Sequence, residues 1–214
     1  MKQQTTRILF NYWNEVRGPR PAPRRLEIEP ARIAAILPES FILERISVSC
    51  YRYRLAGTRI CEQFGAELRG RNFLDTWNEQ DRAQLVGRLA MIVSDAAVGL
   101  IEFEVATPHG RAAYEAVLVP LIQAGSRIDR ILGAISAIDA PEWLGGEQPP
   151  RCSLLRHEVI WPERTLPAAP TPKLSRPGER VARLVNVARR QFRVYEGGRA
   201  EHDASAGGEP GTKA

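Results

Sequence analysis

The stretch from Ser40 to Asp139 most constrains the fold, because its apolar residues change from the period of a strand to that of a helix and back. In the clearest of the two opening strand patterns, Tyr51 and Tyr53 alternate with arginines. Strands joined by short turns pair antiparallel, and helices then pack against the sheet. We therefore predict an α+β fold, with a five-stranded antiparallel sheet and helices on one face.

The middle of this stretch, NEQDRAQLVGRLAMIVSDA, predicts the longest helix of the chain, with Asn78 as its N-cap. Its apolar stripe recurs at helical spacing and consists of Leu85, Leu89, Ile92 and Val93. Three strand patterns follow the helix, near 101–105, 114–121 and 131–138. The first of them places Glu102 and Glu104 on one face, which is typical of a half-buried strand with one face exposed to solvent.

Residues 1–29 are predicted to form an amphipathic helix at 6–17 and a proline-rich linker. The apolar side of the helix carries Ile8, Leu9, Tyr12, Trp13 and Val16. An exposed face with these side chains would need a partner, so one hypothesis is a homodimer built on this helix. The alternative is that the helix folds back on the sheet of its own chain.

After the predicted domain at 30–140, the chain carries most of its net charge of +5. We expect an irregular linker at 141–177, a basic amphipathic helix at 178–195 and a disordered tail at 196–214. The basic helix has three interpretations: a solvated helix, a docking element for an acidic signalling protein, or an adaptor for nucleic acid or an anionic membrane surface. Salt dependence would separate these interpretations, because phosphate contacts weaken steeply with added salt and an apolar docking face does not.

Motifs for catalysis are weak in this sequence. The three histidines and three cysteines follow no nucleophile or metal-ligand spacing, and the phosphate-binding and nucleophile-elbow motifs are missing. A small enzyme that uses the Glu102/Glu104 face is the alternative that the residues leave open. The chain has neither a membrane-spanning run nor a secretory leader, so we expect a cytoplasmic protein.

The most specific passage is RLAGTRICEQFGAELRGRNF, in which glycines bound a short helix that follows a strand. This passage resembles the central segment of a PAS domain. Together with Tyr12–Trp13, LVPL at 118–121 and RILGAIS at 130–136, it is similar to a bacterial PAS subfamily of short stand-alone proteins. The resemblance covers about residues 8–140.

The resemblance implies a non-catalytic sensory module that acts by binding a small ligand, a signalling protein partner or a second copy of itself. Cys61 lies in RICEQF, unlike the context of a flavin-linking cysteine, and residues 57–96 contain no histidine for haem. We therefore expect neither haem nor a covalently linked flavin, and the cofactor stays unknown. A ligand pocket between sheet and helices is predicted to be lined by Tyr51, Tyr53, Phe64, Trp77, Leu89, Phe103 and Tyr114.

Overall fold

A computed structural model describes residues 1–107, 110–138 and 151–162, all within one compact unit that spans Met1–Ala169. Its helices are α1 (Gln4–Arg17), α2 (Thr58–Gln63) and α3 (Glu79–Asp95), with 3₁₀ turns η1 (Arg25–Glu27), η2 (Pro30–Glu39) and η3 (Phe73–Thr76). Its strands are β1 (Ser40–Ser47), β2 (Cys50–Ala56), β3 (Val98–Thr107), β4 (Gly110–Ala124), β5 (Arg127–Ala137) and β6 (Arg151–Ile160).

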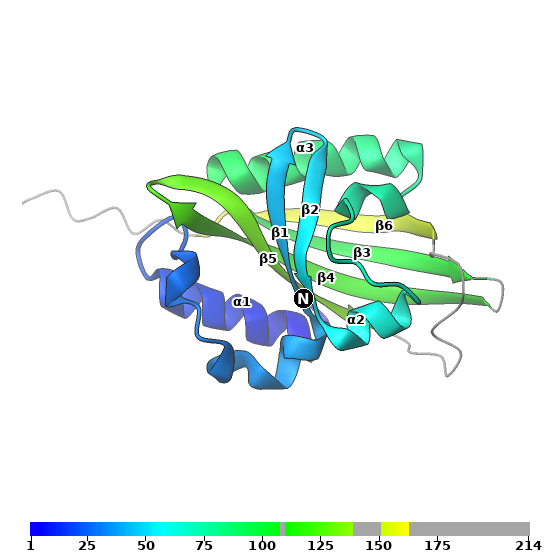
Figure 1. Cartoon of the computed structure of the whole chain (residues 1–214), viewed down its shortest axis with the longest axis horizontal. Helices are drawn as coiled ribbons and strands as arrows, with labels where there is room; N and C mark the ends of the chain where they lie inside the picture. The colour runs from blue at the N-terminus through cyan, green and yellow to red at the C-terminus, as the bar shows by residue number, and fades with distance from the viewer. Residues whose placement is uncertain (108–109, 139–150, 163–214) are drawn as a thin grey trace, which may run out of the picture. The chain divides into compact units, whose positions relative to one another are not determined.

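The six strands form one sheet in the order β2-β1-β5-β4-β3-β6, and every neighbouring pair is antiparallel (Figure 1). The predicted α+β class and the antiparallel sheet are confirmed. The sheet has one strand more than predicted, because β6 lies inside the segment 141–177 that we expected to be an irregular linker. A register shift opposite Glu102 and Phe103 interrupts the pairing of β6 with β3, so its apolar residues do not alternate cleanly along the sequence.

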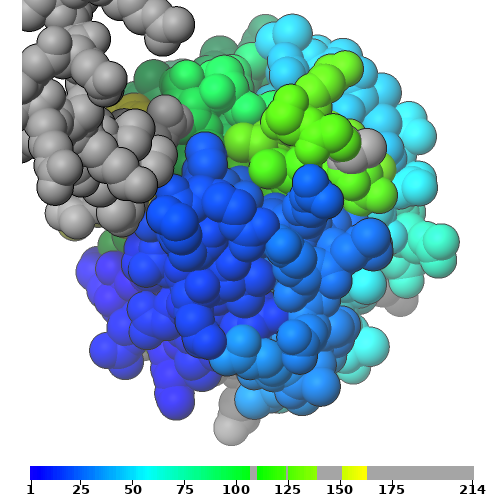
Figure 2. All heavy atoms as spheres, turned by 90° about the vertical axis from the view of Figure 1, so that its left-hand side faces the viewer, coloured from blue at the N-terminus to red at the C-terminus, as the bar shows by residue number. Residues whose placement is uncertain are grey.

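Helices cover both faces of the sheet, whereas the sequence predicted them on one. On the first face, α2, η3 and α3 enclose a cluster of buried side chains that we call the aromatic core. On the second face, α1 and η2 bury a separate apolar cluster against β3, β4 and β5. Figure 2 shows the N-terminal residues, in blue, gathered on one side of the molecule beside the β4–β5 hairpin in lime green.

The predicted helix α3 forms as its pattern requires. The side chain of Asn78 accepts a hydrogen bond from the Asp81 backbone N–H at 2.9 Å, which satisfies one of the free donors of the first turn. The predicted stripe of Leu85, Leu89, Ile92 and Val93 is buried in the aromatic core. The helix ends where Ala96 adopts a left-handed conformation with φ of 56°.

Candidate ligand-binding site

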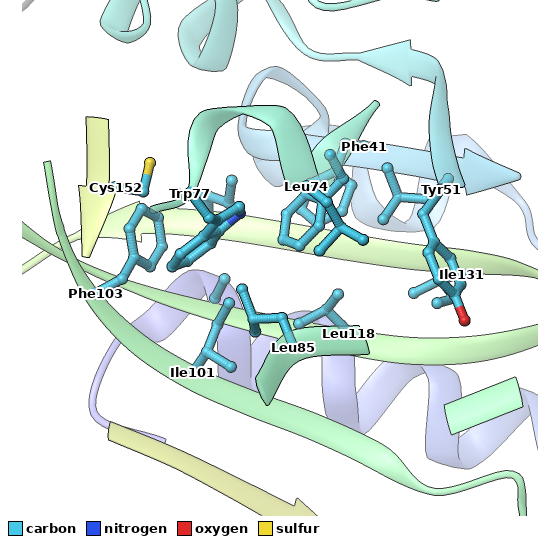
Figure 3. Packing of buried hydrophobic residues seen from close by; sticks show 14 of the residues in the cluster. Phe41, Tyr51, Leu74, Trp77, Leu85, Ile101, Phe103, Leu118, Ile131 and Cys152 are labelled. Carbon is cyan, nitrogen blue, oxygen red and sulfur yellow. The ribbon is translucent and has the colours of Figure 1, made fainter. Parts of the chain in front are cut away.

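All seven residues of the predicted pocket lie in the aromatic core and are at most 7% exposed. Four of the seven form a continuous series of rings: between centroids, Trp77 lies 5.2 Å from Phe103, Phe103 lies 5.3 Å from Tyr114, and Tyr114 lies 6.3 Å from Phe64. Figure 3 shows Trp77 beside Phe103 near Cys152, with Tyr51 at the other end of the cluster near Ile131. The predicted residues therefore come together, but over a length of core rather than around one point.

The space inside this core is small. A cavity beside Leu89, Leu85 and Ile92 has a volume of about 10 Å³, roughly enough for one water molecule. The seven residues thus pack mainly against one another, and a ligand among them would have to displace side chains.

Three of the seven carry buried polar atoms that have no hydrogen-bond partner among the described residues: the hydroxyls of Tyr51 and Tyr114 and the indole nitrogen of Trp77. Buried polar groups in native proteins nearly always have a partner. Burial, together with the nearby Cys152 thiol, raises the pKa of Tyr114, so its hydroxyl stays a neutral donor. The core therefore holds donors that a bound molecule or ordered water could satisfy.

A larger cleft, of about 710 Å³, opens to solvent next to this core. Tyr53 and Trp77 belong both to the predicted pocket and to the wall of the cleft. Its lining comes from β2, residues 68–72, η3, the start of α3 and the start of β6: Cys50, Arg52, Tyr53, Leu68, Gly70, Arg71, Asn72, Asp75, Thr76, Trp77, Asn78, Glu79 and Arg151.

Residues 70–78 build this cleft by connecting the two edge strands of the sheet. At one end, the Tyr53 backbone N–H donates to the carbonyl of Arg71 at 2.9 Å, and the Tyr53 carbonyl accepts from the Gly70 N–H at 2.8 Å. At the other end, Trp77 forms a parallel β-bridge with Cys152 on β6. Asn72 fixes the middle, since its side-chain oxygen accepts from the backbone N–H of Tyr51 at 2.9 Å.

The cleft does not offer a cysteine nucleophile beside Trp77. Burial raises the pKa of the Cys152 thiol to about 12, outweighing a hydrogen bond with Thr76 that lowers it. A thiol with this pKa stays protonated at neutral pH and behaves as a small apolar side chain. In the described part of the chain, no three His, Cys, Asp or Glu side chains gather as a metal site would require.

Comparison with protein families agrees with this architecture. A family model described as PAS domain matches residues 1–136. The chain belongs to the PAS domain family. No curated protein and no solved structure matches it. The match confirms the family inferred from the sequence, and β6 lies beyond the matched residues.

The two carboxylates that the enzyme hypothesis invokes, Glu102 and Glu104, form ion pairs in this PAS domain. Glu102 receives the Lys2 ammonium at 2.8 Å, and Glu104 receives the Arg111 guanidinium at 3.1 Å. Neither carboxylate lines the cleft. Both lie on the α1 side of the sheet, because side chains alternate along β3 and Val98 and Leu100 pack on that side.

Most of the α1 residues that we predicted to form a dimer interface are buried within the PAS domain. Leu9 and Trp13 are fully buried and Tyr12 is 6% exposed, because α1 folds onto the sheet of its own chain. Only Ile8 and Val16 keep partial exposure. The three buried side chains therefore pack against their own chain, and the homodimer stays a prediction.

Other predictions fall on residues that the structure does not describe. The basic helix at 178–195 and the tail at 196–214 lie entirely outside the described residues. So does the predicted linker at 141–177, apart from residues 151–162. Among the described residues, no helix combines the length and the apolar character that crossing a membrane demands.

Glu115, on β4 of the PAS domain, is a buried carboxylate that the sequence analysis missed. It is fully buried and accepts hydrogen bonds from the backbone N–H groups of Lys2 at 2.7 Å and Gln3 at 2.9 Å, and from the Thr6 hydroxyl. It thereby ties the two residues that precede α1, and Thr6 in the first turn of α1, to β4. Burial raises the pKa of Glu115, but these hydrogen bonds outweigh it and leave the pKa below its usual value.

We predict that Glu115→Gln lowers the free energy of unfolding by about 1–3 kcal/mol at pH 7, because an amide N–H₂ would face the donors of α1. A carboxyl whose folded pKa is depressed stabilises the fold above its unfolded pKa and loses that contribution as the pH falls through the folded value. The difference between wild type and Glu115→Gln should therefore shrink below about pH 4. Urea unfolding at several pH values measures it, with Glu104→Gln as the control that changes little; a difference independent of pH would contradict the prediction.

Proposed function

We propose that this PAS domain is a non-catalytic sensory module whose input is a small molecule bound in the cleft and whose output is a changed affinity for a signalling partner. The observation that carries the proposal is the position of Trp77. Trp77 lines the solvent-open cleft, and its ring contacts Phe103 in the aromatic core. A molecule in the cleft would touch a side chain of the core directly.

The same contacts supply a route from the cleft to the opposite face of the sheet. Trp77 contacts Phe103, and Phe103 contacts Tyr114 on β4. The next residue of that strand, Glu115, points to the other face and holds the start of α1. A ligand that shifts the Trp77 ring can therefore bias the docking of α1, provided that it binds the two arrangements with different affinity.

The proposal predicts that native mass spectrometry of the full chain, incubated with small-molecule fractions of a cell extract, detects a one-to-one complex. Cys50→Trp should abolish the complex, because Cys50 lines the cleft and a tryptophan there fills it. Ser49→Trp is the matched control, since Ser49 is the exposed neighbour and does not line the cleft. No complex with any fraction, or an equal complex in Cys50→Trp, would refute binding at the cleft.

A second measurement separates signalling from binding. Hydrogen exchange of the α1 amides should change when the ligand is added, because α1 is the element at the far end of the proposed route. If the protein binds the ligand but the exchange of the α1 amides is unchanged, the proposed binding site stands and the proposed route to α1 is refuted.

A further inference from the structure

We propose that the cleft takes a small molecule with an oxyanion group, a carboxylate or a phosphate, held by Arg52, Arg71 and Arg151. This inference rests on the proposed function and names the chemical class of its ligand. Arg52 and Arg71 belong to the part of the chain that matches the family, whereas Arg151 is supplied by the additional strand β6. The site is therefore assembled from the family domain and from a segment beyond it.

The three arginines are distinguished by lying on one cleft without an acidic partner among the described residues. Other exposed arginines, such as Arg25, also lack such a partner but do not line this cleft. Within the ranges that the structure describes, none of their side chains has an ion pair or a hydrogen bond, although all three line one cleft. Arginines nearby are paired: Arg54 and Arg130 bind Glu44 at 3.2 and 2.8 Å, and Arg59 binds Glu39 at 2.7 Å. A guanidinium presents a planar set of donors that fits carboxylate and phosphate oxygens.

Three other polar side chains of the cleft are already used within the protein. Asn72 accepts from the Tyr51 backbone, the Thr76 hydroxyl donates to the Phe73 carbonyl, and Asn78 caps α3. Two carboxylates also line the cleft. That of Asp75 accepts from the Asn72 amide at 3.0 Å and lies 3.7 Å from Arg82, and that of Glu79 lies in the first turn of α3. The lining thus keeps an excess of free guanidinium groups, which favours an anion over a cation or a neutral sugar.

The wall of the cleft adds a second requirement. Tyr53, Leu68 and Trp77 line it with largely apolar side chains. Trp77 is 7% exposed, and its buried indole nitrogen has no partner among the residues that the structure describes. An oxyanion attached to a small planar body would place its charge at the arginines and its body on this wall. Phenyl phosphate and benzoate combine both features, and benzyl alcohol has the body without the charge.

Binding of these three probes and of inorganic phosphate to the full chain is measured by isothermal titration calorimetry at constant ionic strength. We expect phenyl phosphate or benzoate to bind at least about 10-fold more tightly than benzyl alcohol, as charge-assisted hydrogen bonds require. The triple variant Arg52→Gln, Arg71→Gln, Arg151→Gln should lose this preference. Arg25→Gln, an exposed arginine that does not line the cleft, should keep it. Circular dichroism and melting temperature confirm that the variants are folded.

The comparison of phenyl phosphate with benzoate shows which oxyanion the site prefers, and Arg151→Gln alone shows whether β6 takes part. Equal binding of benzyl alcohol, or anion binding that survives the triple variant, would overturn the proposal. If an extract ligand is lost in Cys50→Trp but binds the triple arginine variant normally, the anion class fails and the proposed function stands. If the probes bind through the arginines while α1 exchange is unchanged, the anion site stands and the signalling route fails.

Discussion

Gly133→Ala should lower the free energy of unfolding by about 3 kcal/mol or more, at the upper end of what overpacking a core costs. A Cβ atom at Gly133 would lie 2.1 Å from Cζ of Phe41 on the paired strand β1. The Phe41 ring cannot easily move away, because it packs against Tyr53 at 5.7 Å and Phe73 at 6.2 Å between centroids. Urea unfolding followed by circular dichroism measures the change.

Gly87→Ala is the matched control for this substitution. Gly87 lies in the exposed part of α3, and a Cβ there would meet no atom within 4 Å. The alanine should stabilise the protein by about 0.5–1 kcal/mol, because it is the better helix former. If both variants changed the free energy of unfolding by the same amount, Phe41 would not pack as closely against Gly133 as the structure shows.

Trp13→Ala should cost about 3–5 kcal/mol, the usual effect of removing a buried aromatic side chain. Trp13 is fully buried between α1 and the sheet, and its indole nitrogen donates to the Pro120 carbonyl at 2.8 Å. The variant therefore loses apolar contact area and leaves a buried carbonyl without its donor. Thermal and urea unfolding measure the loss.

Trp161→Ala removes the same side chain at a position that is 58% exposed, and should change stability by no more than about 0.5 kcal/mol.

Protein concentration distinguishes the two roles that the sequence left open for α1. If Trp13 packs on its own sheet, the effect of Trp13→Ala is independent of concentration. An effect that shrinks as the proteins are diluted would instead assign Trp13 to a contact between copies, because a dimer stabilises its subunits less at low concentration.

The cleft shows how much of the site was hidden from sequence reasoning. The predicted residues were found by strand parity and helical spacing, which identify side chains that face inward. Two of them, Tyr53 and Trp77, also reach the cleft. The three arginines escaped because each reads locally as a solvated residue, and their meeting depends on β6 pairing with β3 and on residues 70–78 joining both sheet edges.

Local patterns in the chain were enough to predict the strands of the core and the cap and buried stripe of α3, because hydrophobic period and capping act between residues close in sequence. The PAS family came from the resemblance of the passage around residues 54–73 to a known family. Local patterns could not say what α1 packs against, since an amphipathic face suits its own sheet as well as a second copy. Nor could they reveal β6, the bonds from Glu115 to the start of α1, or the arginine cleft. Those features join residues that lie between about 45 and about 110 positions apart, and only the packing of the sheet brings them together.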